Sequence, residues 1–190
     1  MIKTQIKHRG GMRKKYPSRH ISEYSSERNL VRIIPLGGME EVGRNMTVFE
    51  YGKDIVVLDM GMQFPEEDMP GIDYIIPASR YLQGKEKNIR GVILSHGHLD
   101  HIGAIPHLLP RLGWPTVYAS RMTLALVKKR LEEAQLLKFF KSHEIKSPDE
   151  KISFDDIKVS FFASTHSIMD SLGTIIQTPV ANIIHPGDWK

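Results

Sequence analysis

Three histidines and one aspartate lie within six positions near the middle of the chain, in the segment Ser95-His96-Gly97-His98-Leu99-Asp100-His101. Burying such polar groups without partners costs roughly 2–7 kcal/mol each, whereas a metal ion satisfies several of them at once. Imidazole and carboxylate groups are ligands for Zn²⁺ and also for Mn²⁺. The spacing lets His96 and His98 turn toward one ion, and Asp100 and His101 toward a neighbouring ion. The segment therefore predicts a site for two divalent metal ions; the alternative is a solvated loop that happens to be rich in histidine.

Three further side chains that can complete such a site follow apolar runs that we expect to form β-strands. His166 follows the run 157–163, Asp188 follows 181–185, and Asp59 ends the run 55–59. Loops at strand ends often carry functional side chains, because the rigid strands hold them in place. We therefore expect His166 and Asp188 to join the cluster. Asp59 has a second interpretation, an ordinary carboxylate that caps nearby backbone donors.

The elements that must position these residues are predicted from the hydrophobic pattern. Strands are predicted at 30–36, 45–51, 54–60, 91–95, 116–119, 157–163, 174–178 and 181–185. Helices are predicted at 101–112 and 121–142, the second with Ser120 as its N-cap. The apolar stripe of the longer helix consists of Leu124, Val127, Leu131, Ala134 and Leu137. The predicted fold class is α/β (α+β layered), with helices packed outside β-sheets.

The composition is that of a soluble globular protein. The chain has 190 residues, of which 41% are hydrophobic and 25% charged, enough for one domain with a sizeable core. No apolar stretch approaches the roughly 18–20 residues that span a bilayer, and the N-terminal region lacks the apolar centre of a signal peptide. We therefore expect a cytoplasmic location and no membrane partner. Because the chain has no Cys, disulfides and thiolate metal ligands are excluded.

Positive charge is concentrated at the start of the chain. The formal net charge is +4, yet residues 1–29 contain eight Lys or Arg residues against two Glu, and few large apolar residues. Such a composition predicts a disordered tail over 1–29. A basic tail can bind polyanions by releasing counterions, or it can be a solvated and dispensable segment. Both interpretations remain open.

Several segments together resemble the metallo-β-lactamase fold and, within it, the ribonuclease J family of the β-CASP group of RNA-processing nucleases. The His-x-His-x-Asp-His motif by itself indicates only the superfamily, which includes lactamases, thioesterases, lactonases and nucleases. The narrower resemblance is carried, in this order, by segments 34–46 (IPLGGMEEVGRNM), 59–65 (DMGMQFP), 95–104 (SHGHLDHIGA), 166–171 (HSIMDS) and 187–190 (GDWK). It covers the chain from about Leu30 onward.

The resemblance implies a role for each candidate residue. One ion would be bound by His96, His98 and His166, and a second by Asp100 and His101, with Asp188 bridging both. Asp100, His101 and Asp188 would be the catalytic residues. Asp59 would be a buried acid that hydrogen-bonds and orients the ligand loop. The implied cofactors are two divalent ions, Zn²⁺ in the first place and Mn²⁺ as the alternative.

The implied function is metal-dependent hydrolysis of RNA phosphodiester bonds in RNA processing and decay, including rRNA processing. Two neighbouring cations activate water and neutralise the phosphate oxygens as charge builds up on them. Members of the family degrade RNA from the 5′ to the 3′ end and can also cut internally, and the full-length protein is expected to form homo-oligomers. Two alternatives remain: another hydrolase of the same fold, such as a glyoxalase-type thioesterase, and a non-catalytic RNA-binding fragment or scaffold.

The resemblance covers only part of the family's architecture. An αββα sandwich is expected, of which residues 30–190 supply about the first half. The β-CASP region, the C-terminal region and a final histidine ligand of the second ion would lie further along, so we expect a partial reading frame. Half a sandwich leaves one sheet face uncovered, which predicts self-association. The isolated fragment is expected to be inactive.

Overall fold

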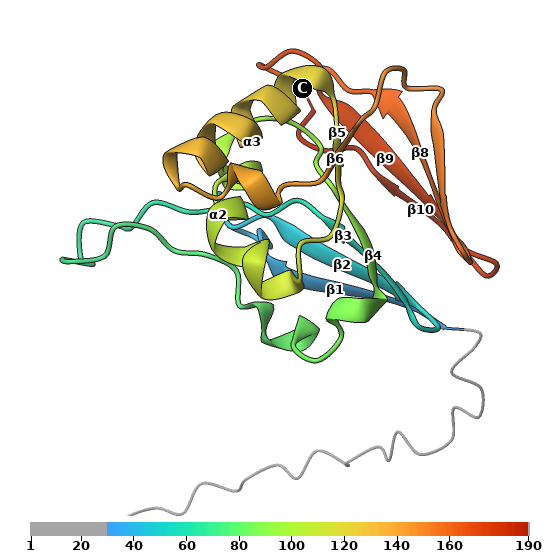
Figure 1. Ribbon diagram of the computed structural model, residues 1–190, viewed down its shortest axis with the longest axis horizontal. Coiled ribbons are helices and arrows are strands. Elements are labelled where there is room, and N and C mark those ends of the chain that lie inside the picture. Colours follow the sequence, from blue (N-terminus) through green and yellow to red (C-terminus); the bar gives the residue numbers. More distant parts are fainter. Residues whose placement is uncertain (1–29, 190) are drawn as a thin grey trace, which may run out of the picture.

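Two β-sheets pack face to face, and the α-helices lie on the outer side of the first sheet (Figure 1). The computed structural model describes residues 30–189. The predicted tail over 1–29 lies outside the described residues. The layers are therefore helix, sheet and sheet, in agreement with the predicted α/β class and with an incomplete αββα sandwich. No helix among residues 30–189 is both long enough and apolar enough to cross a membrane.

The first sheet combines an antiparallel half with a parallel half. Its six strands follow one another in sequence order: β1 (Val31–Gly37), β2 (Met46–Tyr51), β3 (Asp54–Leu58), β4 (Ile89–Ile93), β5 (Val117–Ala119) and β6 (Ser142–Glu144). β1, β2 and β3 pair antiparallel, whereas β3, β4, β5 and β6 pair parallel. β3 is buried along its whole length, as expected of a strand in a sheet that is covered on both faces.

The second sheet is antiparallel throughout. Its order is β10 (Asn182–His185), β9 (Leu172–Gln177), β8 (Ile157–Ala163) and β7 (Lys151–Phe154). Alternate residues of β8, including Val159 and Phe161, are buried against the first sheet. Ile184 on β10 points the other way and is 66% exposed. The second sheet thus has one buried and one open face in the described part of the chain.

Two hydrophobic cores hold the layers together. The first lies between the first sheet and the helices, and includes Val57, Val92, Ile105 and Val127. The second lies between the two sheets, and includes Val56, Ile93, Val159 and Ile176. Neighbouring residues of β3 and β4 contribute to opposite cores because successive side chains of a strand point to opposite faces. The central strands are therefore fixed from both sides.

The prediction of one continuous helix at 101–112 is wrong. The segment forms α1 (Leu99–Ile102), α2 (Ile105–Leu108) and the 3₁₀ helix η4 (Pro110–Leu112). The helix is interrupted because the Ala104 N–H donates to the Met60 carbonyl, 2.9 Å away, instead of to a helical neighbour. Pro106 has no N–H with which to continue the ladder. The break lets the chain stay close to the end of β3 while it turns.

The predicted helix at 121–142 is too long. The helix α3 (Arg121–Glu133) does begin after Ser120. It ends because Gln135 adopts a left-handed backbone with φ of 58°, and the Leu136 N–H donates to the Leu131 carbonyl at 2.7 Å, a Schellman-type ending. Ala134 is consequently exposed rather than part of the stripe. The remaining residues form the 3₁₀ helix η5 (Leu137–Phe139) and β6.

Candidate metal centre

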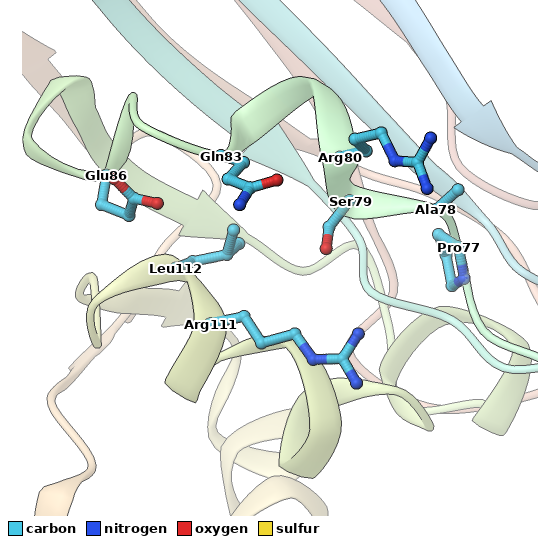
Figure 2. Close-up of a pocket in the computed structure, with 8 residues that line it drawn as sticks. All are labelled: Pro77, Ala78, Ser79, Arg80, Gln83, Glu86, Arg111 and Leu112. Atoms are coloured by element: carbon cyan, nitrogen blue, oxygen red, sulfur yellow. The ribbon is translucent and has the colours of Figure 1, made fainter.

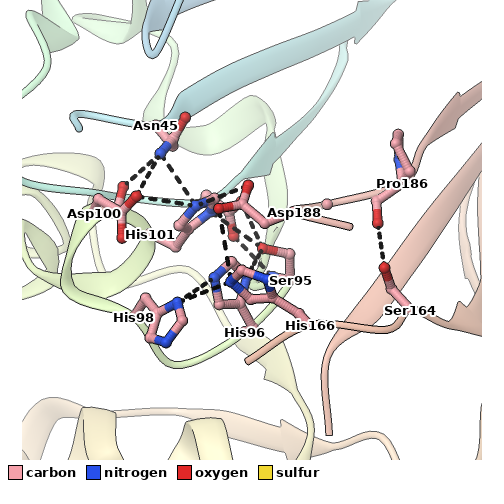
Figure 3. Close-up of polar contacts among 12 residues, drawn as sticks. Asn45, Ser95, His96, His98, Asp100, His101, Ser164, His166, Pro186 and Asp188 are labelled. Carbon is pink, nitrogen blue, oxygen red and sulfur yellow. Dashed lines mark hydrogen bonds and ion pairs between the residues drawn. The ribbon is translucent and has the colours of Figure 1, made fainter. Parts of the chain in front are cut away.

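Each predicted site residue follows one of four strands, and those labelled in Figure 3 converge on one place. Asp59 follows β3, the segment 95–101 follows β4, His166 follows β8, and Asp188 follows β10. β3 and β4 are parallel neighbours, and β8 and β10 both run antiparallel to β9. The carboxyl ends of each pair therefore lie side by side. The structure brings all seven predicted site residues together.

Three imidazole rings converge in the first group of this site. His96 Nε2 and His166 Nε2 each lie 3.1 Å from His98 Nδ1. The three nitrogen atoms lie within 4.8 Å of one another. A neutral imidazole carries only one N–H, so three converging ring nitrogens cannot all be satisfied by sharing protons. A divalent ion fits this arrangement, because imidazole nitrogen is a common ligand of Zn²⁺ and related metals.

The second group gathers around His101 and Asp188. Nε2 of His101 lies 3.4 Å from Asp188 Oδ1 and 3.5 Å from Asp100 Oδ2. The other oxygen of Asp188, Oδ2, lies 3.8 Å from His166 Nε2. Asp188 therefore stands between the two groups, with one oxygen toward each. Together with His101 and Asp188, His96 completes a second set of donor atoms within 4.8 Å of one another.

Asp59 is buried beneath the second group. It contacts Nδ1 of His101, whereas Asp188 faces the other ring nitrogen, Nε2. Its Oδ1 accepts the Ser95 backbone N–H at 2.8 Å, and its Oδ2 accepts from Ser95 Oγ at 2.8 Å. Oδ2 also lies 2.8 Å from His101 Nδ1. The carboxylate thus caps a backbone donor and also orients an imidazole. With the Nδ1–H donated to Asp59, Nε2 of His101 faces Asp100 and Asp188.

Burial and neighbouring charges set the protonation of the buried groups. Burial lowers the pKa of His96, assisted by the charge of His101, to about 4. Burial also lowers the pKa of His101, but the charge of Asp59 and the hydrogen bonds that His101 donates to Asp100 and Asp59 outweigh it and raise the pKa to about 10. Burial raises the pKa of Asp59, yet the charge and hydrogen bond of His101 bring it below the ordinary value. At neutral pH His96 is therefore neutral, the form in which imidazole binds metal, while His101 holds a second proton that would have to leave before its Nε2 could bind a metal ion.

Two residues at the site were not assigned a role from the sequence. Ser95 donates its hydroxyl to Asp59, and the same oxygen lies 3.0 Å from His96 Nδ1. The Nδ2 atom of Asn45 lies 3.1 Å from His101 Nε2. Asn45 belongs to the segment 34–46, whose glycines indicate a loop. Nothing in the local sequence pattern indicates that this loop lies beside His101. The contact follows only from the tertiary structure.

Two cavities differ in their relation to this site. A cavity of about 220 Å³ opens beside it and is lined by Gly38, Asn45, His101, His185 and Asp188, among others. A cavity of about 500 Å³ is lined in part by residues of the 3₁₀ helix η2 (Ser79–Leu82) and of η4 (Figure 2). Glu86, which begins η3 (Glu86–Asn88) just before β4, also lines it. The larger cavity thus lies at the amino ends of β4 and β5, whereas the metal centre lies at the carboxyl ends.

Comparison with known proteins agrees with this geometry. The chain is 45% identical over 166 residues to ribonuclease J from Thermus thermophilus, covering 84% of this chain and 29% of that protein. It is 38% identical over 167 residues to ribonuclease J from Synechocystis, covering 87% of this chain and 26% of that protein. The chain therefore spans less than a third of the length of these relatives.

Solved structures share the fold at low sequence identity. A protein of unknown function from Enterococcus faecalis V583 superimposes with a TM-score of 0.64 at 19% identity, covering 84% of this chain and 44% of that one. The metallo-beta-lactamase fold protein YhfI from Bacillus subtilis superimposes with a TM-score of 0.60 at 15% identity, covering 84% of this chain and 63% of that one. The model of the metallo-beta-lactamase superfamily matches residues 39–188, which include every residue of the two converging groups. The chain therefore belongs to the metallo-beta-lactamase superfamily.

Proposed function

We propose that the chain is the N-terminal part of a metal-dependent ribonuclease that hydrolyses RNA phosphodiester bonds. The proposed activity is 5′-to-3′ exonucleolytic, with internal cleavage as a second mode. The observation that carries the proposal is the convergence of six His and Asp side chains that could bind metal, in a chain 45% identical to a ribonuclease J. In this proposal residues 30–190 are the N-terminal part of the metallo-β-lactamase domain, which agrees with their covering 29% of that relative.

The metal assignment is part of the proposal. One ion would be held by His96, His98 and His166, and the second by Asp100 and His101, with Asp188 shared between them. When bound, two divalent ions supply a nucleophile from water at neutral pH and neutralise the phosphate oxygens. We propose Zn²⁺ as the resident metal, with Mn²⁺ as the alternative, because imidazole and carboxylate ligands suit both.

The chain's own residues prepare the site for this chemistry. Asp59 accepts the Nδ1–H of His101 and thereby aims Nε2 of the same ring at the proposed second ion. His96 is kept neutral by burial, because its pKa is lowered to about 4. The two oxygens of Asp188 face His101 and His166 respectively. Each of these contacts holds a donor atom in place before a metal arrives, so the ligands need little rearrangement.

The relatives also suggest the partner and setting of the protein. Ribonuclease J acts on RNA, as its name states, and we propose RNA as the substrate here, with RNA processing and decay, including rRNA processing, as the process. We further propose a cytoplasmic location and a homo-oligomeric full-length protein.

The test compares two substrates on the complete gene product that contains this chain, loaded with Zn²⁺ or Mn²⁺. Release of mononucleotides from 5′-monophosphorylated RNA supports the proposal. Hydrolysis of a thioester without cleavage of RNA contradicts it and favours a thioesterase of the same fold. Binding of RNA without cleavage, unchanged in Asp100→Ala and His101→Ala, favours a non-catalytic RNA-binding protein. Loss of cleavage in both variants, with RNA binding retained, supports the assigned roles.

A further inference from the structure

Asn45 joins the loop between β1 and β2 to the turn that carries the proposed ligands of the second ion. Its backbone N–H donates to the Asp100 carbonyl at 3.0 Å, and its own carbonyl accepts the Gly61 N–H at 2.8 Å. Its side-chain Nδ2 donates to the same Asp100 carbonyl at 3.1 Å. Two donors of one residue thus converge on a single carbonyl of the ligand turn. Since that carbonyl is not a metal ligand, both bonds are compatible with a metal-loaded site.

The amide of Asn45 also faces the two ligand side chains themselves (Figure 3). Nδ2 lies 3.3 Å from Asp100 Oδ2 and 3.1 Å from His101 Nε2. The Asp100 carbonyl and the Asp100 carboxylate are both acceptors, so the side chain must present its NH₂ group to this turn. Within residues 30–189, the Asn45 side chain makes no hydrogen bond to His96, His98 or His166. Among the proposed metal ligands, the Asn45 side chain is therefore within hydrogen-bond distance of Asp100 and His101 alone.

Two glycines make this close approach possible. A Cβ on Gly38 would lie 2.3 Å from Asn45 Oδ1, and Gly38 has a φ of +83°. A Cβ on Gly61 would lie 1.5 Å from the Asp100 carbonyl oxygen and 2.7 Å from the Asn45 nitrogen. Only glycine fits at either position, since any other side chain would push Asn45 or the ligand turn away. We call these three residues, Gly38, Asn45 and Gly61, the Asn45 clamp.

We propose that Asn45 is a positioning residue for the second metal ion, and that the Asn45 clamp exists to hold Asp100 and His101 at the distance this ion requires. The inference rests on the proposed two-ion site and extends it to a residue that binds no metal. It also gives a physical reason for Gly38 in segment 34–46. Partners that orient metal ligands are typically worth about 10–100-fold in metal affinity. We therefore expect the Asn45 clamp to contribute this factor to the second ion alone.

The test is a calorimetric titration of the metal-free complete gene product with Zn²⁺, repeated with Co²⁺, whose absorption spectrum reports each ion's ligand geometry. The wild-type protein is expected to bind two ions. Asn45→Ala is expected to bind the first ion with unchanged affinity and the second about 10–100-fold more weakly. Asn45→Ser, whose single hydroxyl donor cannot replace both N–H donors of the amide, is expected to behave in the same way. Asn182→Ala, a matched change at an exposed position on β10, should alter neither ion.

The outcomes separate positioning from general structural support. First-ion ligands come from segments after β4 and β8, so unchanged first-ion affinity shows that both sheets of the variant are folded. Selective weakening of the second ion, with a changed Co²⁺ spectrum, supports the inference. Equal weakening of both ions, or no change in either, overturns it. A wild-type protein that binds a single ion overturns both this inference and the two-ion assignment. Because no RNA is used, a protein with two ions but no ribonuclease activity would contradict the proposed function only.

Discussion

Nδ1 of His101 lies 2.8 Å from Oδ2 of Asp59, and each side chain is only 2% exposed. Asp59 reaches this position from the end of β3 with a left-handed backbone, φ of 62°. Such a conformation costs a non-glycine residue about 1–3 kcal/mol. It is tolerated here because the carboxylate accepts hydrogen bonds from both the backbone and the hydroxyl of Ser95 as well as from His101. Strain of this kind tends to occur at functional sites.

Replacing Asp59 by Asn should weaken the second ion in particular. Asp59→Asn keeps the size of the side chain but removes the charge that raises the pKa of His101. We expect this pKa to fall toward its ordinary value and the affinity for the second ion to fall about 10–100-fold. NMR titration of the metal-free protein measures the first effect, and calorimetry with Zn²⁺ measures the second. Asp149→Asn, at an exposed turn, is the control, and an unchanged second ion in Asp59→Asn would contradict the orienting role.

The stability of the metal-free protein should pass through a maximum near pH 6.5. The pKa of His96 is lowered from 6.5 to about 4, so its contribution is complete above pH 6.5 and is lost as the pH falls toward 4. The pKa of His101 is raised from 6.5 to about 10, so its contribution is complete below pH 6.5 and is lost as the pH rises toward 10. The free energy of unfolding, measured with guanidinium at a series of pH values, should therefore rise with pH on the acidic limb of the profile, below pH 6.5, and fall on the alkaline limb above it.

Single substitutions should remove one limb of this profile at a time. His96→Gln is expected to flatten the acidic limb, and His101→Gln the alkaline limb, because each removes the group that titrates there. The slope attributable to one group is at most about 1.4 kcal/mol per pH unit. An alkaline limb that persists unchanged in His101→Gln would show that other groups cause it.

Ligand substitutions should divide into three classes by metal content. His98→Ala is expected to lose the first ion, Asp100→Ala the second, and Asp188→Ala to weaken both, because the oxygens of Asp188 face one group each. The loss of affinity should exceed about 100-fold, since even orienting partners are worth 10–100-fold. Elemental analysis after dialysis measures the stoichiometry. His107→Ala, whose ring stacks on Tyr74 away from the site, should keep both ions; an Asp188→Ala protein that loses only one ion would refute the bridging role.

Removal of metal should lower thermal stability reversibly. An ion that binds only the folded state stabilises it by about 2.7 kcal/mol when its concentration is 100 times its Kd. Melting temperatures should therefore fall on treatment with EDTA and recover on addition of Zn²⁺ or Mn²⁺, and the metal that restores more at equal concentration identifies the preferred ion. The same additions should have little effect on Asp188→Ala, since Asp188 is the side chain that faces both groups of donors. An equal shift in Asp188→Ala would place the stabilising metal elsewhere.

The sequence by itself predicted the features that depend on neighbouring residues. The strands around Gly52 and those that became β8, β9 and β10 lie within about two residues of their predicted bounds, because alternating apolar residues mark a half-buried strand locally. The cluster of His and Asp residues at 96–101 is also visible in the sequence, because these residues lie close together along the chain. The helix end at Gln135 and the short strands β6 and β7 were not predicted, because a left-handed residue and a short strand leave little periodic signal.

Only the tertiary structure decided which residues act together at the site. Asp59 and His101 are 42 positions apart, and Asn45 and Asp100 are 55 positions apart. Their contacts arise because β3 pairs with β4 and because Gly38 and Gly61 admit a backbone approach that a Cβ would block. The side chains that could bind metal can therefore be predicted from residue type and spacing. The hydrogen bonds that orient those side chains depend on strand pairing and close packing between distant segments, which a local sequence pattern does not reveal.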